Sequence, residues 1–200
     1  MKKAFIFAGL ISATSLFSCS QETTQADSQE VIETELNEMQ PEEAVQDTIK
    51  GSIKSEAVGK IGNADIRINY HAPGVKGRVI WGGLVPYGQV WVTGAHMATN
   101  LETNKDLLIG GKELKAGKYA LFTIPGKDEW TVIINKNWEQ HLADNYSEAD
   151  DILRVNVKPE MLGKHQERLK YELAEQEAGK GALRIFWEKV GITIPIEVKK

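Results

Sequence analysis

Beyond the first quarter of the chain, apolar and polar residues alternate with a period of two. Residues 64–70 show the pattern most clearly, because Ile66, Ile68 and Tyr70 are separated by single polar residues. Successive side chains of a β-strand point to opposite faces, so this alternation predicts a strand with one buried face. Helical periodicity is weak in the same region, and we expect one short helical piece within residues 138–146.

More short apolar or alternating stretches follow, and turn-forming residues such as Gly, Pro, Asp and Asn separate them. The expected strands are residues 112–114, 119–124, 130–135, 151–157, 167–173, 182–187 and 192–198. Many short strands with little helix between them predict an all-β fold, an antiparallel β-sandwich. A jelly-roll-like or barrel-like arrangement is left open by the pattern.

The single cysteine, Cys19, lies at the end of an apolar N-terminal stretch. Two lysines precede the apolar residues 4–16, and this run is shorter than the roughly 20 residues of a transmembrane helix. The sequence Leu-Phe-Ser-Cys at residues 16–19 resembles the lipobox of bacterial lipoproteins. We therefore predict a signal peptide over residues 1–18 and lipid attachment at Cys19, with ordinary cleavage nearby as the alternative.

The lipobox resemblance also implies a location. By the sorting rule known for such lipoproteins, Ser20 in place of aspartate after Cys19 favours the outer membrane over the inner one. We expect the protein in the cell envelope, held to a membrane through its lipid anchor, on a face that the sequence leaves open. With no second cysteine, the rest of the chain can form no disulfide, thiolate metal site or cysteine nucleophile.

We interpret residues 19–50 as a tether between the lipid and a single domain over residues 51–200. Within residues 20–49 there are nine Asp or Glu and no Lys or Arg. Such a segment has too little apolar surface to offset the entropy of ordering, so we expect it to be extended, with a marginal helix near residues 31–39 as a possible exception. From residue 50 onward, twenty-two Lys or Arg face nineteen Asp or Glu. This near balance gives no electrostatic support for nucleic-acid binding.

One stretch interrupts the strand rhythm. Residues 70–99, here called the aromatic segment, concentrate Gly, Pro and aromatic residues together with two of the four histidines. Aromatic rings offer flat amphipathic surfaces, and arginine offers a planar fork for a carboxylate or phosphate. The candidate ligand-binding residues are Tyr70, His71, Arg78, Trp81, Tyr87, Trp91, Thr93 and His96. Packing of this stretch over the sandwich is the plainer alternative, whereas Trp130 and Trp187 lie in strand patterns and are expected in the core.

The same stretch resembles the DUF2911 family. The matching residues are Tyr70, Pro73, 76–78, 81–88, Val90, Trp91, 93–95, Ala98 and Thr99, with further matches at 114–130, 186–188 and 195–196. The resemblance extends over residues 52–198. It implies an exported bacterial protein of a group found mainly in Bacteroidetes, and it assigns no activity.

Several enzyme classes lack their motifs here. Beyond residue 50 the serines are Ser52, Ser55 and Ser147, and none lies in a Gly-x-Ser-x-Gly elbow. Phosphate loops, dinucleotide fingerprints and His-Glu-x-x-His helices are missing from the sequence, so no cofactor is expected. The adjacent carboxylates at 128–129 and 150–151 would point to opposite faces of a strand, which disfavours an acid/base pair.

The two histidines of the aromatic segment permit a metal site. If His71 and His96 converge, with Glu102 or Asp65 added, they could bind zinc or a similar divalent ion. Otherwise they order a turn, and His141 and His165 are expected at the surface.

Three hypotheses about function follow from these patterns. The first is a non-catalytic module that binds a small molecule, a glycan or a protein. The second is a metal-assisted hydrolase that uses His71 and His96, and the third is a structural protein of the envelope. The decisive observation is whether His71, Arg78, Trp91 and His96 line one cavity.

Overall fold

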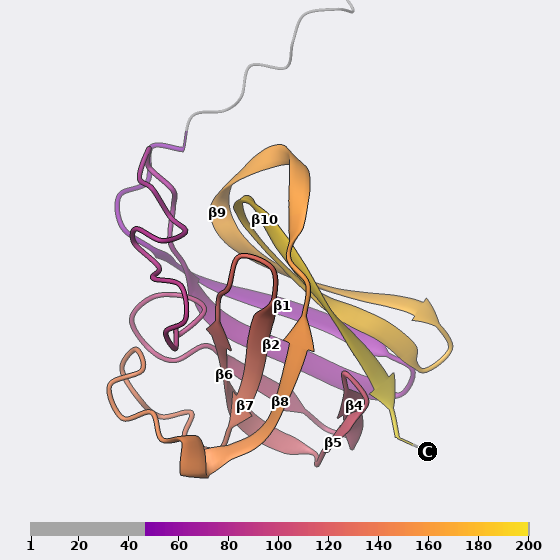
Figure 1. Ribbon diagram of the computed structural model, residues 1–200. Coiled ribbons are helices and arrows are strands. Elements are labelled where there is room, and N and C mark those ends of the chain that lie inside the picture. The colour runs from indigo at the N-terminus through magenta and orange to yellow at the C-terminus, as the bar shows by residue number, and fades with distance from the viewer. Residues whose placement is uncertain (1–46, 200) are drawn as a thin grey trace, which may run out of the picture. The chain divides into compact units, whose positions relative to one another are not determined.

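The computed structural model describes residues 47–199, so the signal peptide, Cys19 and most of the tether lie outside the described residues, as does the helix considered near 31–39. Ten strands and one short 3-10 helix make up the described part (Figure 1). The first five strands are β1 (Ile53–Ile61), β2 (Ala64–Ala72), β3 (Asn100–Thr103), β4 (Leu107–Ile109) and β5 (Lys112–Leu114). The remaining elements are β6 (Gly117–Ile124), β7 (Trp130–Asn135), η1 (Glu148–Asp150), β8 (Asp151–Val157), β9 (Glu160–Glu177) and β10 (Lys180–Val198).

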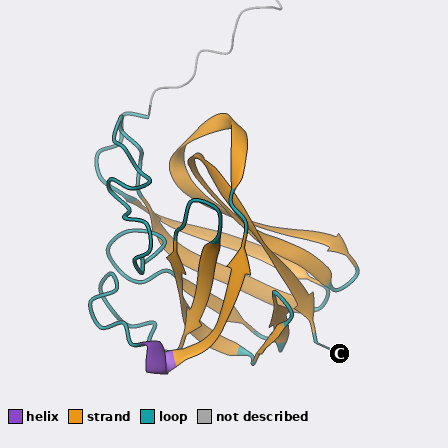
Figure 2. Cartoon of the chain, viewed as in Figure 1, coloured by secondary structure: helices purple, strands orange, loops and turns teal. Residues whose placement is uncertain are grey.

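The strands form two antiparallel sheets. The larger sheet has the order β1-β2-β3-β6-β7-β8, and the smaller has the order β5-β4-β10-β9. Every strand pair in both sheets is antiparallel. Both sheets are open, so the predicted all-β antiparallel sandwich is confirmed and a closed barrel is not formed. Figure 2 shows strands throughout the described part, with loops gathered along one side of the sheets.

The alternation in β2 sets its orientation in the sheet. Ile66 and Ile68 are fully buried, whereas Asp65 and Arg67 between them are exposed. The buried face joins a large apolar cluster to which both sheets contribute. Burial of such side chains contributes roughly 1.5 to 3 kcal/mol each, so this cluster stabilises a domain that contains no disulfide.

The strands β6 and β7 have apolar residues in succession because they are covered on both sides. Leu121 and Ile134 belong to the large cluster, while the neighbouring Phe122 and Ile133 belong to a second, smaller cluster. The second cluster includes Val92 of the aromatic segment. The aromatic segment therefore covers the outer face of the larger sheet, next to the loop of residues 136–147.

Two predictions about local structure are wrong. The expected strands 182–187 and 192–198 are parts of one strand, because β10 stays paired with β9 through irregularities in register on either side of Glu188. The expected helical piece at 138–146 is a loop followed by η1. Side-chain hydrogen bonds hold this loop: Asn135 Nδ2 donates to Ser147 O at 3.0 Å, and Tyr146 Oη donates to Asp151 Oδ2 at 2.9 Å.

Three strands were not predicted. They are β1, β3 and β4. β3 and β4 are short, with four and three residues, and β1 carries few large apolar side chains. No helix within residues 47–199 is long and apolar enough to cross a membrane.

Candidate functional site

The aromatic segment leaves β2 and is fastened to two different sheets. At its start, Leu169 N donates to Pro73 O at 3.0 Å and Val75 N donates to Glu167 O at 2.8 Å, which ties it to β9 of the smaller sheet. Further along, Trp91 pairs with Thr123 of β6 through two backbone hydrogen bonds of 2.7 and 3.0 Å. The segment thus bridges the sandwich at one end, and its irregular backbone has its polar groups satisfied by neighbouring strands.

A tight turn lies between these two attachments. Leu84 N donates to Val79 O at 3.0 Å and Val85 N donates to Ile80 O at 2.9 Å. A Cβ atom at Gly83 would lie 2.4 Å from Val79 O, so the turn closes only around a glycine. This requirement explains part of the glycine enrichment that marks the segment in the sequence.

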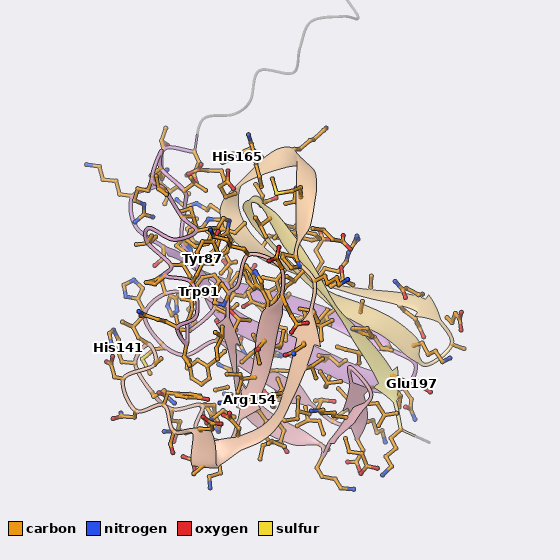
Figure 3. All side chains as sticks on the ribbon, viewed as in Figure 1. Tyr87, Trp91, His141, Arg154, His165 and Glu197 are labelled. Atoms are coloured by element: carbon orange, nitrogen blue, oxygen red, sulfur yellow. The ribbon has the colours of Figure 1, made fainter. Side chains whose placement is uncertain are left out.

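A cavity of about 740 Å³ borders this turn, because Leu84 and Val85 are among its lining residues. Its lining comes from the N-terminal end of the described chain, the aromatic segment, the 136–147 loop and β10. The lining residues are Gly51, Ser52, Pro73, Gly74, Lys76, Arg78, Leu84, Val85, Val90, Trp91, Val92, Gly94, Ala95, His96, Leu142, Ala143 and Trp187. This volume lies within the range of pockets that hold small organic ligands. In Figure 3, Trp91 lies on the side of the molecule where the loops gather.

Two tryptophans give the cavity a rigid aromatic wall. The rings of Trp91 and Trp187 are stacked, with centroids 5.6 Å apart and planes inclined by 16°. Trp187 is almost fully buried and donates from Nε1 to Glu167 O at 3.3 Å, whereas Trp91 is partly exposed. Trp81 and Trp130 complete a group of four indoles, each with its ring edge-on to Trp91. Ring contacts with the other three indoles therefore hold Trp91 in place.

Arg78 is an exposed residue of the lining whose side chain is fixed by its own turn. Its Nε donates to Val75 O at 3.1 Å and its Nη2 donates to Gly74 O at 2.5 Å. No carboxylate within residues 47–199 forms an ion pair with it. Since a guanidinium has five N–H donors, three remain for a ligand or for water.

The histidines His71 and His96 converge as the metal hypothesis requires. Their rings meet edge to face with centroids 5.2 Å apart, and His96 has a left-handed backbone with φ of 61°. Burial lowers the pKa of His71, and the charges of His96 and Lys54 lower it further. Within residues 47–199, however, no group of three or more His, Cys, Asp or Glu side chains could hold a metal ion. Protein zinc sites use three or four side-chain ligands, so the pair falls short of one.

Asp47, at the N-terminal end of the described residues, is bound to the domain by ion pairs with Arg168 and Lys76. The Arg168 guanidinium forms an ion pair with the Asp47 carboxylate and donates to Ile49 O at 2.7 Å and to Gly51 O at 2.9 Å. Lys76 also contacts the Asp47 carboxylate, at 3.3 Å. Hydrogen bonding from Arg168 is the main reason that the pKa of Asp47 falls to about 2. The last residues assigned to the tether are thus bound to the domain, and they place Gly51 and Ser52 at the cavity.

Five of the eight candidate residues lie outside the cavity lining, and His71 is one of them. Tyr70 is buried and packs against Tyr171 at a centroid distance of 4.5 Å. Thr93 is fully buried, and its carbonyl accepts a 2.6 Å hydrogen bond from Tyr171 Oη. Both residues therefore fix the segment to the core. Trp81 and Tyr87 line a smaller depression of about 190 Å³ beside Trp130.

The structure brings Arg78, Trp91 and His96 to one cavity, and His71 contacts the last of these from outside the lining. Sequence reasoning missed the two lining segments that lie outside the aromatic segment and β10, which contribute Gly51 and Ser52 and Leu142 and Ala143. Leu142 and Ala143 come from a loop far along the chain, and no periodic pattern marks them as partners of the aromatic segment. Lys76 was identified only as part of the family resemblance. Trp187 was expected in the core, and it is both buried and part of the cavity wall.

Comparison with known protein families settles the chain's relationships. The profile of the family described as "Protein of unknown function (DUF2911)" matches residues 52–196, which include β1 to β9 and all but the last two residues of β10. The chain belongs to the DUF2911 family. The DUF2911 domain thus comprises both sheets, the aromatic segment and the cavity. Comparisons with curated proteins and with solved structures gave no significant match.

Proposed function

We propose that this DUF2911 protein is a non-catalytic, ligand-binding module of the bacterial cell envelope. The observation that carries the proposal is the 740 Å³ cavity with the stacked Trp91 and Trp187 in its wall. Rigid aromatic walls lose little entropy when a ligand binds, which is a general advantage of preformed sites.

A binding role accounts for the site better than a structural plug does. In a plug, the candidate side chains would be buried and their polar atoms paired within the domain. Instead Arg78 is exposed and keeps unused donors, and Trp91 is partly exposed at a cavity. The cavity lining contains one serine, Ser52, one histidine and no carboxylate, so the groups needed for acid/base or nucleophilic chemistry are sparse there.

Occupancy of the cavity is tested with an uncharged, environment-sensitive dye such as prodan. We expect the full-length chain to bind the dye with a blue-shifted emission, and Ala95→Trp, which fills the cavity from its lining, to reduce binding at least about fivefold. Ala149→Trp is the matched control, because Ala149 is exposed in η1 and lies outside the cavity. Equal dye binding by both variants and the parent chain would contradict the proposal.

The envelope location rests on the N-terminal sequence, outside the described residues. Several acyl chains on Cys19 would hold the protein at a membrane, since each buried methylene contributes about 0.8 kcal/mol. In a bacterial host, we expect labelled palmitate to enter the full-length protein and to be absent from Cys19→Ala. Soluble, unlabelled protein in both cases would contradict the anchor and would leave the binding proposal to be judged by the dye.

A further inference from the structure

The charge of the cavity lining has one sign. Lys76 and Arg78 are its charged residues, and no Asp or Glu contributes to it. The Lys76 charge is partly satisfied by Asp47, whose carboxylate lies 3.3 Å away. Arg78 has no such partner within residues 47–199, although three of the other four arginines pair with carboxylates. The cavity therefore presents one uncompensated guanidinium.

The position of this guanidinium is set before any ligand arrives. Two of its N–H groups donate to the carbonyls of Gly74 and Val75, within the same turn. Both acceptors belong to buried residues, and Val75 N is in turn bound to Glu167 O of β9. An arginine held in this way loses little freedom on binding an anion, and its remaining donors match the two oxygens of a carboxylate or phosphate.

Apart from Ser52 and His96, the side chains of the rest of the lining are apolar. Trp91 and Trp187 form the stacked wall, and Val85, Val90 and Leu142 add aliphatic surface. Leu84 and Leu142 are both more than one-third exposed, which extends this surface to the exterior. Apolar surface next to a single cation that has no carboxylate partner suits a molecule with an apolar body and one anionic end, because each part then meets its complement.

We infer that the cavity binds an amphipathic small molecule with one anionic head group, a carboxylate or phosphate, held by Arg78. This inference rests on the proposed ligand-binding function and names the class of ligand. Carboxylate and phosphate share the chemistry that Arg78 recognises, and the probes below distinguish them.

The test compares molecules that differ only in the head group. Octanoate, octyl phosphate and octan-1-ol are titrated into the full-length chain by calorimetry at pH 7 and low salt. We expect at least one of the anions to bind about tenfold or more tightly than the alcohol, since hydrogen bonds to charged groups contribute more than neutral ones. Raising the salt concentration should weaken the binding of the anion and leave the binding of the alcohol unchanged or slightly stronger.

Arg78→Gln removes the charge and should reduce this preference to less than about twofold, while octan-1-ol keeps its affinity. Lys76→Gln should have a smaller effect, because Asp47 already partly satisfies Lys76. Lys127→Gln is the charge-matched control, since Lys127 is exposed and lies outside this cavity. Retained octanol binding by Arg78→Gln shows that the variant is folded, and if that binding is lost, Lys76→Gln together with the salt series carries the test.

The two proposals fail differently. Equal affinity for the alcohol and both anions overturns the ligand class and leaves the binding function standing. An anion preference that persists in Arg78→Gln overturns the role of Arg78. If neither the three probes nor the neutral dye binds, the proposed function itself falls.

Discussion

The imidazole of His71, near the end of β2, meets that of His96, in the aromatic segment, edge to face with ring centroids 5.2 Å apart. The two residues belong to parts of the chain that only the fold brings together. Burial is the larger cause of the lowered pKa of His71, and the like charge of His96 adds to it. Proton uptake by His71 in β2 therefore depends on the charge of His96, which lines the cavity.

The His71 titration can be read by NMR. We expect its midpoint below the ordinary value of 6.5, and a partial upward shift in His96→Gln, because that variant removes a like charge and leaves the burial. His165→Gln is the control and should leave the midpoint unchanged. A midpoint at or above 6.5 in the parent chain would contradict the burial of this ring.

The same lowered pKa predicts how stability depends on pH. The unfolded chain takes up a proton at His71 as the pH falls through 6.5, whereas the folded chain resists protonation until a lower pH. Stability should therefore decrease as the pH falls below 6.5. Thermal melts at pH 7.5 and pH 5.5 should show a smaller loss for His71→Gln than for the parent chain, and an identical loss in both would argue against the linkage.

The Asp47–Arg168 ion pair predicts that the stability of the fold decreases further at lower pH. With a folded-state pKa of about 2 against 3.8 for the free side chain, the contribution of Asp47 is present above pH 3.8 and is lost as the pH falls toward 2. Asp47→Asn should melt below the parent chain at pH 7, and the gap should narrow below pH 3.8. Asp128→Asn, in the exposed β6–β7 turn, is the control and should melt like the parent chain at pH 7.

Trp187 should be essential to stability. It is 1 % exposed and its ring contacts those of Trp81 and Trp91, so Trp187→Ala should cost roughly 3 to 5 kcal/mol in the free energy of unfolding, measured by urea denaturation. Trp138→Ala, a change to a partly buried tryptophan at the second cluster, should cost roughly half as much. A cost for Trp187→Ala no larger than that for Trp138→Ala would contradict this prediction.

Gly83 should affect both stability and binding. In Gly83→Ala the new Cβ would lie 2.4 Å from Val79 O, so the turn has to open, at a cost of roughly 1 to 3 kcal/mol. Because Leu84 and Val85 of this turn line the cavity, prodan binding should weaken as well. Gly163→Ala has open space at its Cβ and should change neither quantity.

Metal content tests the hydrolase alternative directly. Protein purified without chelator should contain well below one equivalent of zinc by elemental analysis, because two imidazoles are fewer ligands than protein zinc sites use. His71→Ala/His96→Ala should give the same value. One equivalent that disappears in the double variant would instead favour the enzyme.

Sequence patterns identified the strands whose own side chains carry a clear apolar pattern. β5, β7 and β8 begin and end at the predicted residues, and β2 and β6 extend the predicted stretches by only a few residues. Their signals come from side chains of the strand itself. In contrast, the exposed face of β1 and the shortness of β3 and β4 hid them, because pairing with neighbours decides whether such segments form strands.

The amino-acid sequence by itself determined the all-β class and the family and marked the aromatic segment as the candidate site, because alternation and glycine-aromatic composition are properties of neighbouring residues. Only the tertiary structure decided which of those residues share a cavity. Arg78, Trp91 and His96 meet there with Leu142 and Trp187, while Tyr70 and Thr93 turn into the core. The physical reason is that a cavity forms where the side chains of separate segments do not fill the space between them. The sequence of any one segment does not show how well it packs against the others.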